Sequence, residues 1–289
     1  MKIEIRRAKA SDKEPLMSFI KDVWGGTDYI PEVWDDWLRS KDGVMNVMTV
    51  DGVPMGMNRM RFMEDGSAWL EGVRIHPDYR GRGLASRLGR ASMKEARSKG
   101  VERFRLATGS RNRAAQRQIA KMGFIETARL ACFETKAGAE FKRLKSARRL
   151  RRADFGLAVS RITESSEYSK GGGVYWDEFT ATSLTPEVIR KRIREGSVFE
   201  HHGALAIWRP GREGGERWSQ VCFLTGEPSR AVELAGHVFA SSLQKVDRNL
   251  VYVPKGSKVA GALLRAGLTK RWPLILYTKS PSDKLRMNG

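Results

Sequence analysis

The spacing of hydrophobic positions along the chain predicts an ordered series of strands and helices. Residues 2–6 alternate between polar and apolar side chains, which is typical of a half-buried strand. Ser11 and Glu14 have the spacing of a capping box, and the apolar residues after them predict a first helix. Pro31 can open a second helix, because a proline at the first helical position removes no intrahelical hydrogen bond.

Further strands and two more helices follow in the first half of the chain. A three-strand meander is predicted because Asp51-Gly52 and residues 64–66 are turn sequences between apolar runs at residues 44–50, 53–63 and 69–75. Residues 83–99 have an amphipathic helical pattern that stops at Gly100. The remaining elements predicted in this half are a strand at 102–107, a helix at 112–122, and a strand pair or one bent strand at 124–133.

The second half repeats this order in a weaker form. Its predicted strands cover residues 156–161, 197–200, 204–208, 218–224, 249–253 and 274–278. Its predicted helices cover residues 185–195 and 229–243, with Ser229 as the cap of the second, and residues 262–268 resemble residues 118–124.

Composition narrows the possible partners. The chain has 289 residues and a formal net charge of +20, so its surface attracts anions such as phosphorylated cofactors or nucleic acid. Cys132 and Cys222, the two cysteines, lie in apolar runs, and we expect buried free thiols in a reducing compartment. The sequence shows no apolar signal core, no membrane-spanning run and no metal-ligand spacing. We therefore expect a cytoplasmic protein that binds neither metal nor membrane.

A glycine-rich stretch connects the third strand of the meander to the long helix. Its sequence is Arg80-Gly81-Arg82-Gly83-Leu84-Ala85. Glycine allows backbone N–H groups to approach a ligand closely, and the N-terminus of a helix favours negative charge. The stretch is therefore a candidate site for the pyrophosphate of a CoA-type cofactor.

The chain resembles the GNAT N-acetyltransferase family over roughly residues 1–140. Residues 80–85 fit the family motif Q/R-x-x-G-x-G/A, and residues 73–77 match the end of its fourth strand. Residues 112–115 and 121–124 fit the motif N-x-x-A followed by GF. The resemblance implies an α/β fold with two GNAT-like domains, each with a mainly antiparallel central sheet, splayed fourth and fifth strands and flanking helices.

The predicted domains are a catalytic acetyl-CoA-binding domain at residues 1–141 and a degenerate GNAT-like domain at residues 153–289. Residues 142–152, of which seven of eleven are basic, are interpreted as a linker, with a nucleic-acid contact as the alternative. In the second domain the counterpart of the glycine-rich stretch is residues 225–229, which have one glycine, a glutamate and a proline. That loop is a poor pyrophosphate site, because proline has no N–H group.

The resemblance also implies which residues hold acetyl-CoA. The pantetheine arm would lie along the fourth strand, the pyrophosphate would bind N–H groups between Gly81 and Ser86, and the arginines would add positive charge. The residues so assigned are Val73, Arg74, Ile75, Arg80, Gly81, Arg82, Gly83, Leu84, Ala85, Ser86 and Asn112.

The sequence departs from the family pattern at the proton donor. Ile119 stands where many relatives have a tyrosine that protonates the CoA sulfur, so water, Thr108, Ser110, another tyrosine or unaided departure of the thiolate stay open. Ala107 stands where relatives that act on ribosomal-protein N-termini have a glutamate, which counts against that acceptor. Glu71, in an otherwise apolar strand, is the candidate catalytic base or ammonium ligand, and an arginine-paired structural glutamate is the alternative.

The acceptor would bind at the loop between the first two helices, where Trp24 and Tyr29 form walls and Asp28 binds a cationic amine. This loop and the sequence WLEGVR are similar to a GNAT subgroup that includes histidine N-acetyltransferases. We therefore expect direct transfer of acetyl, in a ternary complex, to a small amine or amino acid. The alternatives are a protein N-terminus or lysine as acceptor, and a non-catalytic CoA-binding or RNA-associated module. We expect a monomer or homodimer and do not favour nucleic acid as a partner.

Overall fold

The chain forms two compact units, each of which is discontinuous in sequence. The computed structural model describes residues 1–136, 141–177, 179–213, 216–241 and 246–281. The first unit contains residues 1–106 and 112–125 and takes up the chain again from residue 277. The second contains residues 107–111 and 126–276. These units divide the chain differently from the predicted domains, since the polypeptide leaves the first unit near residue 125 and returns to it at Tyr277.

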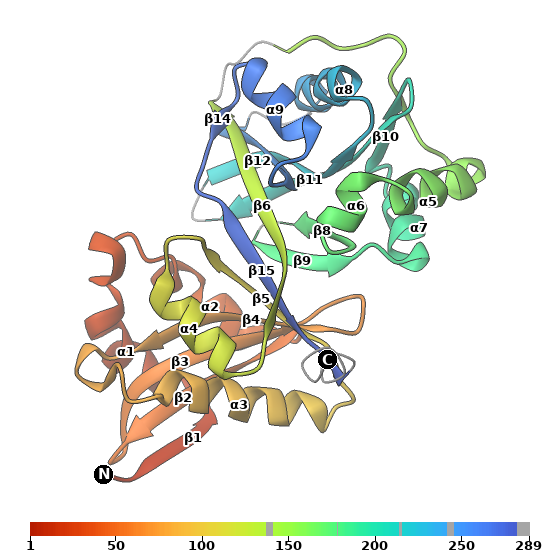
Figure 1. Ribbon diagram of the computed structural model, residues 1–289. Helices are drawn as coiled ribbons and strands as arrows, with labels where there is room; N and C mark the ends of the chain where they lie inside the picture. The colour runs from red at the N-terminus through yellow and green to blue at the C-terminus, as the bar shows by residue number, and fades with distance from the viewer. Residues whose placement is uncertain (137–140, 178, 214–215, 242–245, 282–289) are drawn as a thin grey trace. The chain divides into compact units, whose positions relative to one another are not determined.

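The first unit is a sheet with helices on both faces (Figure 1). Its strand order is β1-β2-β3-β4-β5, antiparallel from β1 to β4 and parallel between β4 and β5. The strands are β1 (Ile3–Arg7), β2 (Gly43–Val50), β3 (Val53–Phe62), β4 (Ala68–Ile75) and β5 (Phe104–Gly109). The helices are α1 (Lys13–Ile20), α2 (Ile30–Arg39), α3 (Leu84–Arg97) and α4 (Arg113–Lys121).

Alternating strand residues divide the hydrophobic core of this unit into two layers. Val47 and Met57 pack with α1 and α2, whereas Met48 and Ile75 pack with the first turns of α3. Buried hydrogen bonds hold α3 on the sheet: the Ser92 hydroxyl donates to Asn58 Oδ1 at 3.0 Å and accepts from Asn46 Nδ2 at 2.9 Å. The start of α3, and with it the glycine-rich loop, is therefore fixed relative to β4.

The second unit repeats this layering. Its strand order is β6-β13-β12-β11-β10-β7, with β14 beside β6 and β8–β9 as a separate hairpin. Its strands are β6 (Ile125–Lys136), β7 (Arg148–Arg149), β8 (Val174–Asp177), β9 (Thr180–Ser183), β10 (Val198–His201), β11 (Ala204–Glu213), β12 (Glu216–Thr225), β13 (Arg248–Pro254), β14 (Thr269–Lys270) and β15 (Leu274–Lys279), the last of which ends in the first unit. Its helices are α5 (Phe155–Thr163), α6 (Ser166–Lys170), α7 (Pro186–Arg194), α8 (Pro228–Ala240) and α9 (Lys258–Arg265).

The structure corrects three local predictions. Residues 156–161 are helical in α5 rather than a strand, because Ala158 and Ile162, four residues apart, are both buried. The start of α1 has no Ser11–Glu14 box; the Asp12 carboxylate instead accepts from the Lys9 N–H at 2.8 Å. Helix α8 is capped by Glu227 rather than Ser229, and residues 242–243 of its predicted span lie outside the described residues.

Both cysteines are buried free thiols, as predicted. Burial raises the pKa of Cys132 to about 11, so this thiol stays protonated and unreactive near neutral pH. Within the described part of the chain, we find no helix with the length and apolar character needed to cross a membrane.

Candidate active site

Strand β4 carries a bulge in its second half. Its pairing with β3 advances three residues, from Glu71 to Arg74, while β3 advances two, from Arg59 to Met57. Gly72 lies in this bulge with φ of +63°, a conformation that glycine adopts without strain. A Cβ atom on Gly72 would lie 2.6 Å from Cζ3 of Trp37 on α2. Both the backbone and the packing therefore require glycine here.

Strands β4 and β5 separate soon after they begin. Their register consists of two pairs, Ala68 with Phe104 and Trp69 with Arg105. From Glu71 to Ile75, β4 pairs with no strand on its β5 side among the described residues. Its end is instead held by arginines: Arg74 Nη1 donates to the Val73 carbonyl and Arg80 Nε donates to the Ile75 carbonyl, each at 3.0 Å. This splayed edge is the feature expected to receive an extended ligand.

The glycine-rich loop ends in an open helix N-terminus. Gly81 and Gly83 have φ of +77° and +73°, and a Cβ at either position would meet no atom within 4 Å. Gly83 is the N-cap of α3 and supplies no side-chain cap, so the first backbone bond across this start runs from the Arg87 N–H to the Gly83 carbonyl at 3.1 Å. The N–H groups from Gly81 to Ser86 have no acceptor among the described residues. Six uncapped donors beside a helix start are a candidate anion site.

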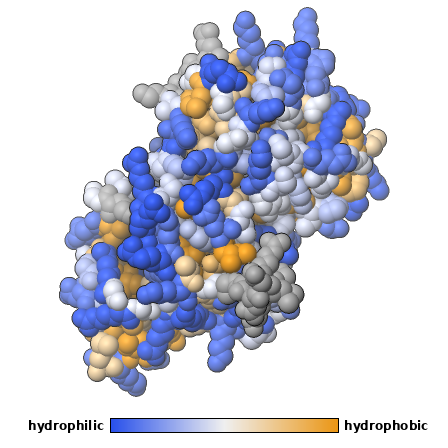
Figure 2. Space-filling view, in the orientation of Figure 1, coloured by the Kyte–Doolittle hydropathy of each residue, from blue (hydrophilic) through white to orange (hydrophobic). Residues whose placement is uncertain are grey.

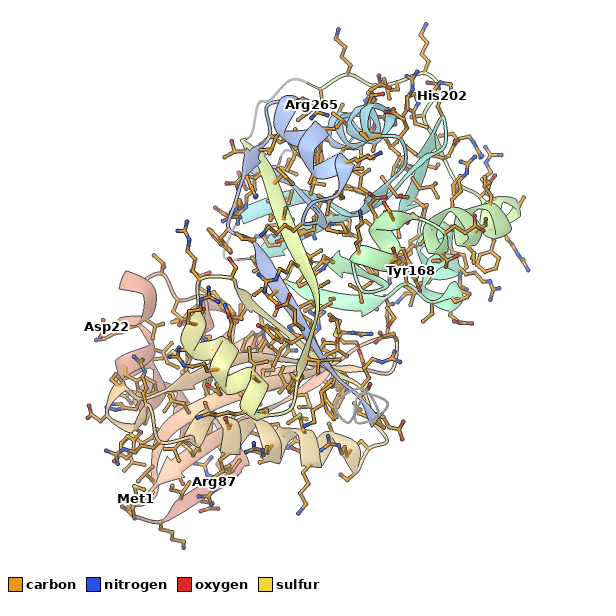
Figure 3. All side chains as sticks on the ribbon, viewed as in Figure 1. Met1, Asp22, Arg87, Tyr168, His202 and Arg265 are labelled. Atoms are coloured by element: carbon orange, nitrogen blue, oxygen red, sulfur yellow. The ribbon has the colours of Figure 1, made fainter. Side chains whose placement is uncertain are left out.

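The side chains around this loop divide into anchoring and exposed groups. Leu84 and Ser86 are buried and Ala85 is half-buried, so the first turn of α3 rests on the sheet. Arg82 lies with its Cζ 5.3 Å from the centroid of the Tyr79 ring, and Arg87 is exposed on the first turn of α3 (Figure 3). His76, before the loop, accepts a hydrogen bond from the Asp78 N–H through Nδ1, which fits its interpretation as a loop residue.

Glu71 belongs to a charged network that reaches β3 and the α2–β2 loop. Its Oε1 accepts from Arg59 Nη1 at 2.5 Å, and Arg59 Nη2 donates to Asp42 Oδ1 at 2.6 Å. Arg59 is buried, with its Cζ 5.0 Å from the Trp37 ring centroid. Burial raises the pKa of Glu71 above its ordinary value, and the Arg59 guanidinium opposes that rise. Glu71 is thus an arginine-paired carboxylate, and its side chain keeps 15% exposure.

The predicted acceptor loop is tied to β4 through a second ion pair. Asp28 Oδ2 and Oδ1 accept from Arg74 Nε at 2.5 Å and Nη2 at 3.1 Å, and the Asp28 side chain has no exposed surface. Asp28 Oδ1 also accepts from the Ile30 N–H at 3.0 Å, which fixes the start of α2. Its carboxylate is thus engaged by Arg74. Tyr29 stacks edge-on against Trp37, with ring centroids 5.8 Å apart, and the Trp24 side chain lies outside the described residues.

Helix α4 provides the third predicted motif. The Asn112 side chain is the N-cap of this helix and accepts from the Ala115 N–H at 3.1 Å. Ile119 is buried, with 5% exposure, as an apolar packing residue must be. Helix α4 therefore presents no proton donor at this position.

The sequence reasoning missed Arg59, Asp42 and the bulge at Gly72. A signal for Arg59 was available, since an arginine that is buried in a mostly apolar strand needs a charged or hydrogen-bonding partner. Its partner Glu71 is twelve residues away on the next strand, opposite Arg59 in the register.

A bulged fourth strand, a fifth strand that splays from it and a glycine-rich loop before a helix are the features on which the resemblance to the GNAT family rests. Residues 12–124 match the model of the acetyltransferase (GNAT) family. This part of the chain belongs to the GNAT N-acetyltransferase family.

Curated relatives are similar to part of the chain. A histidine N-acetyltransferase of Xenopus tropicalis is 31% identical over 125 residues, which is 41% of this chain and 39% of that protein. A histidine N-acetyltransferase of Scomber australasicus is 28% identical over 93 residues, 32% of this chain and 28% of that protein. The chain thus matches well under half the length of these relatives.

Solved structures share the fold of the whole chain. A GCN5-related N-acetyltransferase from Sphaerobacter thermophilus has a TM-score of 0.62 at 13% identity, covering 96% of this chain and 95% of that one. A GCN5-related N-acetyltransferase from Kribbella flavida has a TM-score of 0.50 at 14% identity, covering 96% and 71%. At these identities the likeness describes the fold alone, and it extends over both units.

Proposed function

We propose that this protein transfers acetyl from acetyl-CoA to the amine of a small molecule or amino acid, by direct attack in a ternary complex. The observation that carries the proposal is the uncapped N-terminus of α3 directly after a splayed β4. The histidine N-acetyltransferase relatives support a small acceptor, because the acceptor in their name is an amino acid.

The residues of the first unit fit acetyl-CoA. The open N–H groups from Gly81 to Ser86 would bind its pyrophosphate, and Arg82 and Arg87 would add positive charge. The space around Gly81 and Gly83 supports this assignment, because no protein atom fills it. When bound, the cofactor supplies an activated acetyl thioester. Asn112 caps its own helix through Oδ1, so its amide Nδ2 is the group we assign to the cofactor side.

Glu71 is the residue we assign to proton transfer. An amine must be neutral to attack a thioester, and a base whose pKa lies nearer to neutrality accepts its proton more effectively. Burial raises the pKa of Glu71, and the bond to Arg59 fixes the position of one carboxylate oxygen. The other oxygen, Oε2, forms no hydrogen bond with the described residues and would receive the proton or hold the ammonium group.

The second unit is proposed to bind no CoA. At the start of α8, Glu227 Oε2 accepts from the N–H groups of Ser229 at 3.0 Å and Arg230 at 3.1 Å. Pro228, at the first position of the helix, has no N–H group. A carboxylate of the chain itself therefore occupies the donors that stay open at α3.

A thiol-release screen tests the function. The full chain and acetyl-CoA are mixed with amino acids, polyamines, aminoglycosides or N-terminal peptides, and released CoA is measured with a thiol reagent. Both protein thiols are buried, so the signal reports CoA. We expect release with a small amine or amino acid. Release with peptides alone would move the acceptor to proteins, and no release with any amine would contradict the enzyme.

Glu71→Gln tests the catalytic residue once an acceptor is known. We expect kcat to fall by about 10²–10⁴-fold, the usual contribution of a positioned base, with acetyl-CoA binding retained. Glu102→Gln is the matched control, since Glu102 is an exposed carboxylate of the same unit. If Glu71→Gln and Glu102→Gln have the same kcat and KM, Glu71 has a structural role only.

A further inference from the structure

A cavity of about 450 Å³ lies within the second unit, between the turn at 152–154, the start of α5 and the end of α7. Its lining consists of three arginines and two apolar residues, Arg152, Phe155, Arg190, Ile193 and Arg194. None of these residues belongs to the proposed acetyltransferase site, which lies in the first unit. The volume is in the range of small-molecule sites in proteins.

The three arginines of this cavity form no ion pair with the described residues. Arg152, Arg190 and Arg194 are exposed and, among the described residues, none of them forms an ion pair. Arg190 and Arg194 are four residues apart on α7, where like charges on one helix face repel. This concentration of cations in one cavity is unfavourable until an anion enters it.

The neighbouring carboxylates are engaged elsewhere. Asp154 accepts from Arg148 Nη1 at 3.0 Å and 3.1 Å through its two oxygens. Glu195 accepts from Arg192 at 2.7 Å. Glu187, on the first turn of α7, accepts hydrogen bonds from Thr185 and its own backbone, although it remains within electrostatic reach of Arg190.

The rest of the lining suits an apolar ring. Phe155 is half-buried, and Arg190 lies over it with Cζ 4.3 Å from the ring centroid. Ile193 is buried, with 5% exposure, and forms apolar surface beside the arginines. A flat ring can stack on a guanidinium plane that is itself stacked on an aromatic side chain. Figure 2 shows hydrophobic and hydrophilic surface side by side at the edge of the molecule where Figure 1 places α5.

We propose that this cavity binds a phosphate monoester that carries a flat ring, such as a mononucleotide. Guanidinium groups pair with phosphate oxygens in a bidentate manner, and three of them match a dianion. The ring would lie against Arg190 and Ile193. The site is independent of the acetyl-transfer site, so its occupancy does not depend on the function proposed above.

Calorimetric titration of the full chain with AMP tests this site. We expect adenosine and inorganic phosphate to bind at least about tenfold more weakly than AMP, because each lacks half of the contacts. The double variant R190A/R194A should lose AMP binding by at least about tenfold, while thiol release from acetyl-CoA is retained. The matched control is Arg265→Ala, an exposed arginine on α9 of the same unit (Figure 3), which should bind AMP as the wild type does.

Two further arms make the test decisive. Gly83→Asp blocks the anion site of α3, so AMP binding that persists in this variant and disappears in R190A/R194A assigns it to the second unit. A single-stranded oligonucleotide is titrated in parallel. If the oligonucleotide binds and AMP does not, the small-ligand proposal is overturned in favour of RNA. Equal AMP affinity in the wild type and in R190A/R194A would overturn the site itself.

Discussion

Replacing Gly72 by alanine should damage both the stability and the activity of the first unit. The added methyl group meets two obstacles, since the φ of +63° is strained for any L-residue and the new Cβ would lie 2.6 Å from Trp37 Cζ3. Trp37 has little freedom to retreat, because Tyr29 packs edge-on against it and Arg59 lies over it. Relief must therefore come from the β4 bulge or from α2.

The expected magnitude follows from these two obstacles. A left-handed conformation costs an alanine about 1–2 kcal/mol, and overpacking a dense contact costs about 1–3 kcal/mol more. The sum, about 2–5 kcal/mol, is a large share of the 5–15 kcal/mol by which domains are typically stable. Because the bulge also positions Glu71, we expect kcat to fall as well.

Gly66→Ala separates the two contributions. Gly66 lies in the β3–β4 turn with φ of +75°, and its Cβ would meet nothing within 4 Å, so this variant carries the conformational cost alone. The assay is native-state hydrogen exchange of the β4 amides, which reports the opening free energy of this unit without requiring the whole chain to unfold in one step. Gly72→Ala should lie about 1–3 kcal/mol below Gly66→Ala. Equal opening free energies for the two variants would refute the packing argument.

Three further predictions concern the same unit. Gly83→Asp should abolish acetyl-CoA binding in a calorimetric titration, because it places a carboxylate on the open α3 donors, whereas Gly100→Asp, with φ of +84° at the other end of α3, should retain it. Asp28→Asn should lower the free energy of unfolding by about 3–5 kcal/mol, since it leaves Arg74 without its buried anion, and an unchanged value would contradict a structural role for this pair. The folded pKa of Glu71 lies above its ordinary 4.5, so kcat/KM should fall as the pH drops through that raised pKa. In a pH–rate profile of Glu71→Gln, this decrease at low pH should be absent. The same shift means that the folded state holds this proton more tightly, so Glu71 should reduce stability as the pH rises from about 4.5 through the folded pKa, and a denaturation series against Glu71→Gln checks the sign.

Local chemistry made much of the first unit predictable. A glycine-rich loop between a strand and a helix is typical of a phosphate site, so residues 80–85 alone predict an anion site at a helix start. Ile119 could be interpreted as a packing residue because helical spacing alone places it with Ala115 and Met122. The meander was equally readable, since Asp51-Gly52 fixes a tight turn between two apolar runs.

Features that depend on residues distant in the sequence could not be predicted. Asp28 and Arg74 are 46 residues apart, so nothing in the loop sequence shows that the carboxylate is engaged. The bulge at Gly72 changes the register without changing the hydrophobic pattern. The short apolar run in α5 fits both the two-residue period of a strand and the 3.6-residue period of a helix. Leu157 and Val159 suggest the alternation of a strand, whereas the burial of Ala158 and Ile162, four residues apart, is that of a helix.

The return of the chain to the first unit at Tyr277 bears on how the protein is made. Lys279, at the end of β15, donates through Nζ to the Met122 carbonyl at the end of α4, and Gly123 leaves room for it, because a Cβ there would lie 2.8 Å from this Nζ. During synthesis, residues 1–125 are made before the part of β15 that completes the first unit. More than 150 further residues must be added before that part of β15 is made. The unit that is begun first is thus completed last, and the second unit can fold while the first is still incomplete.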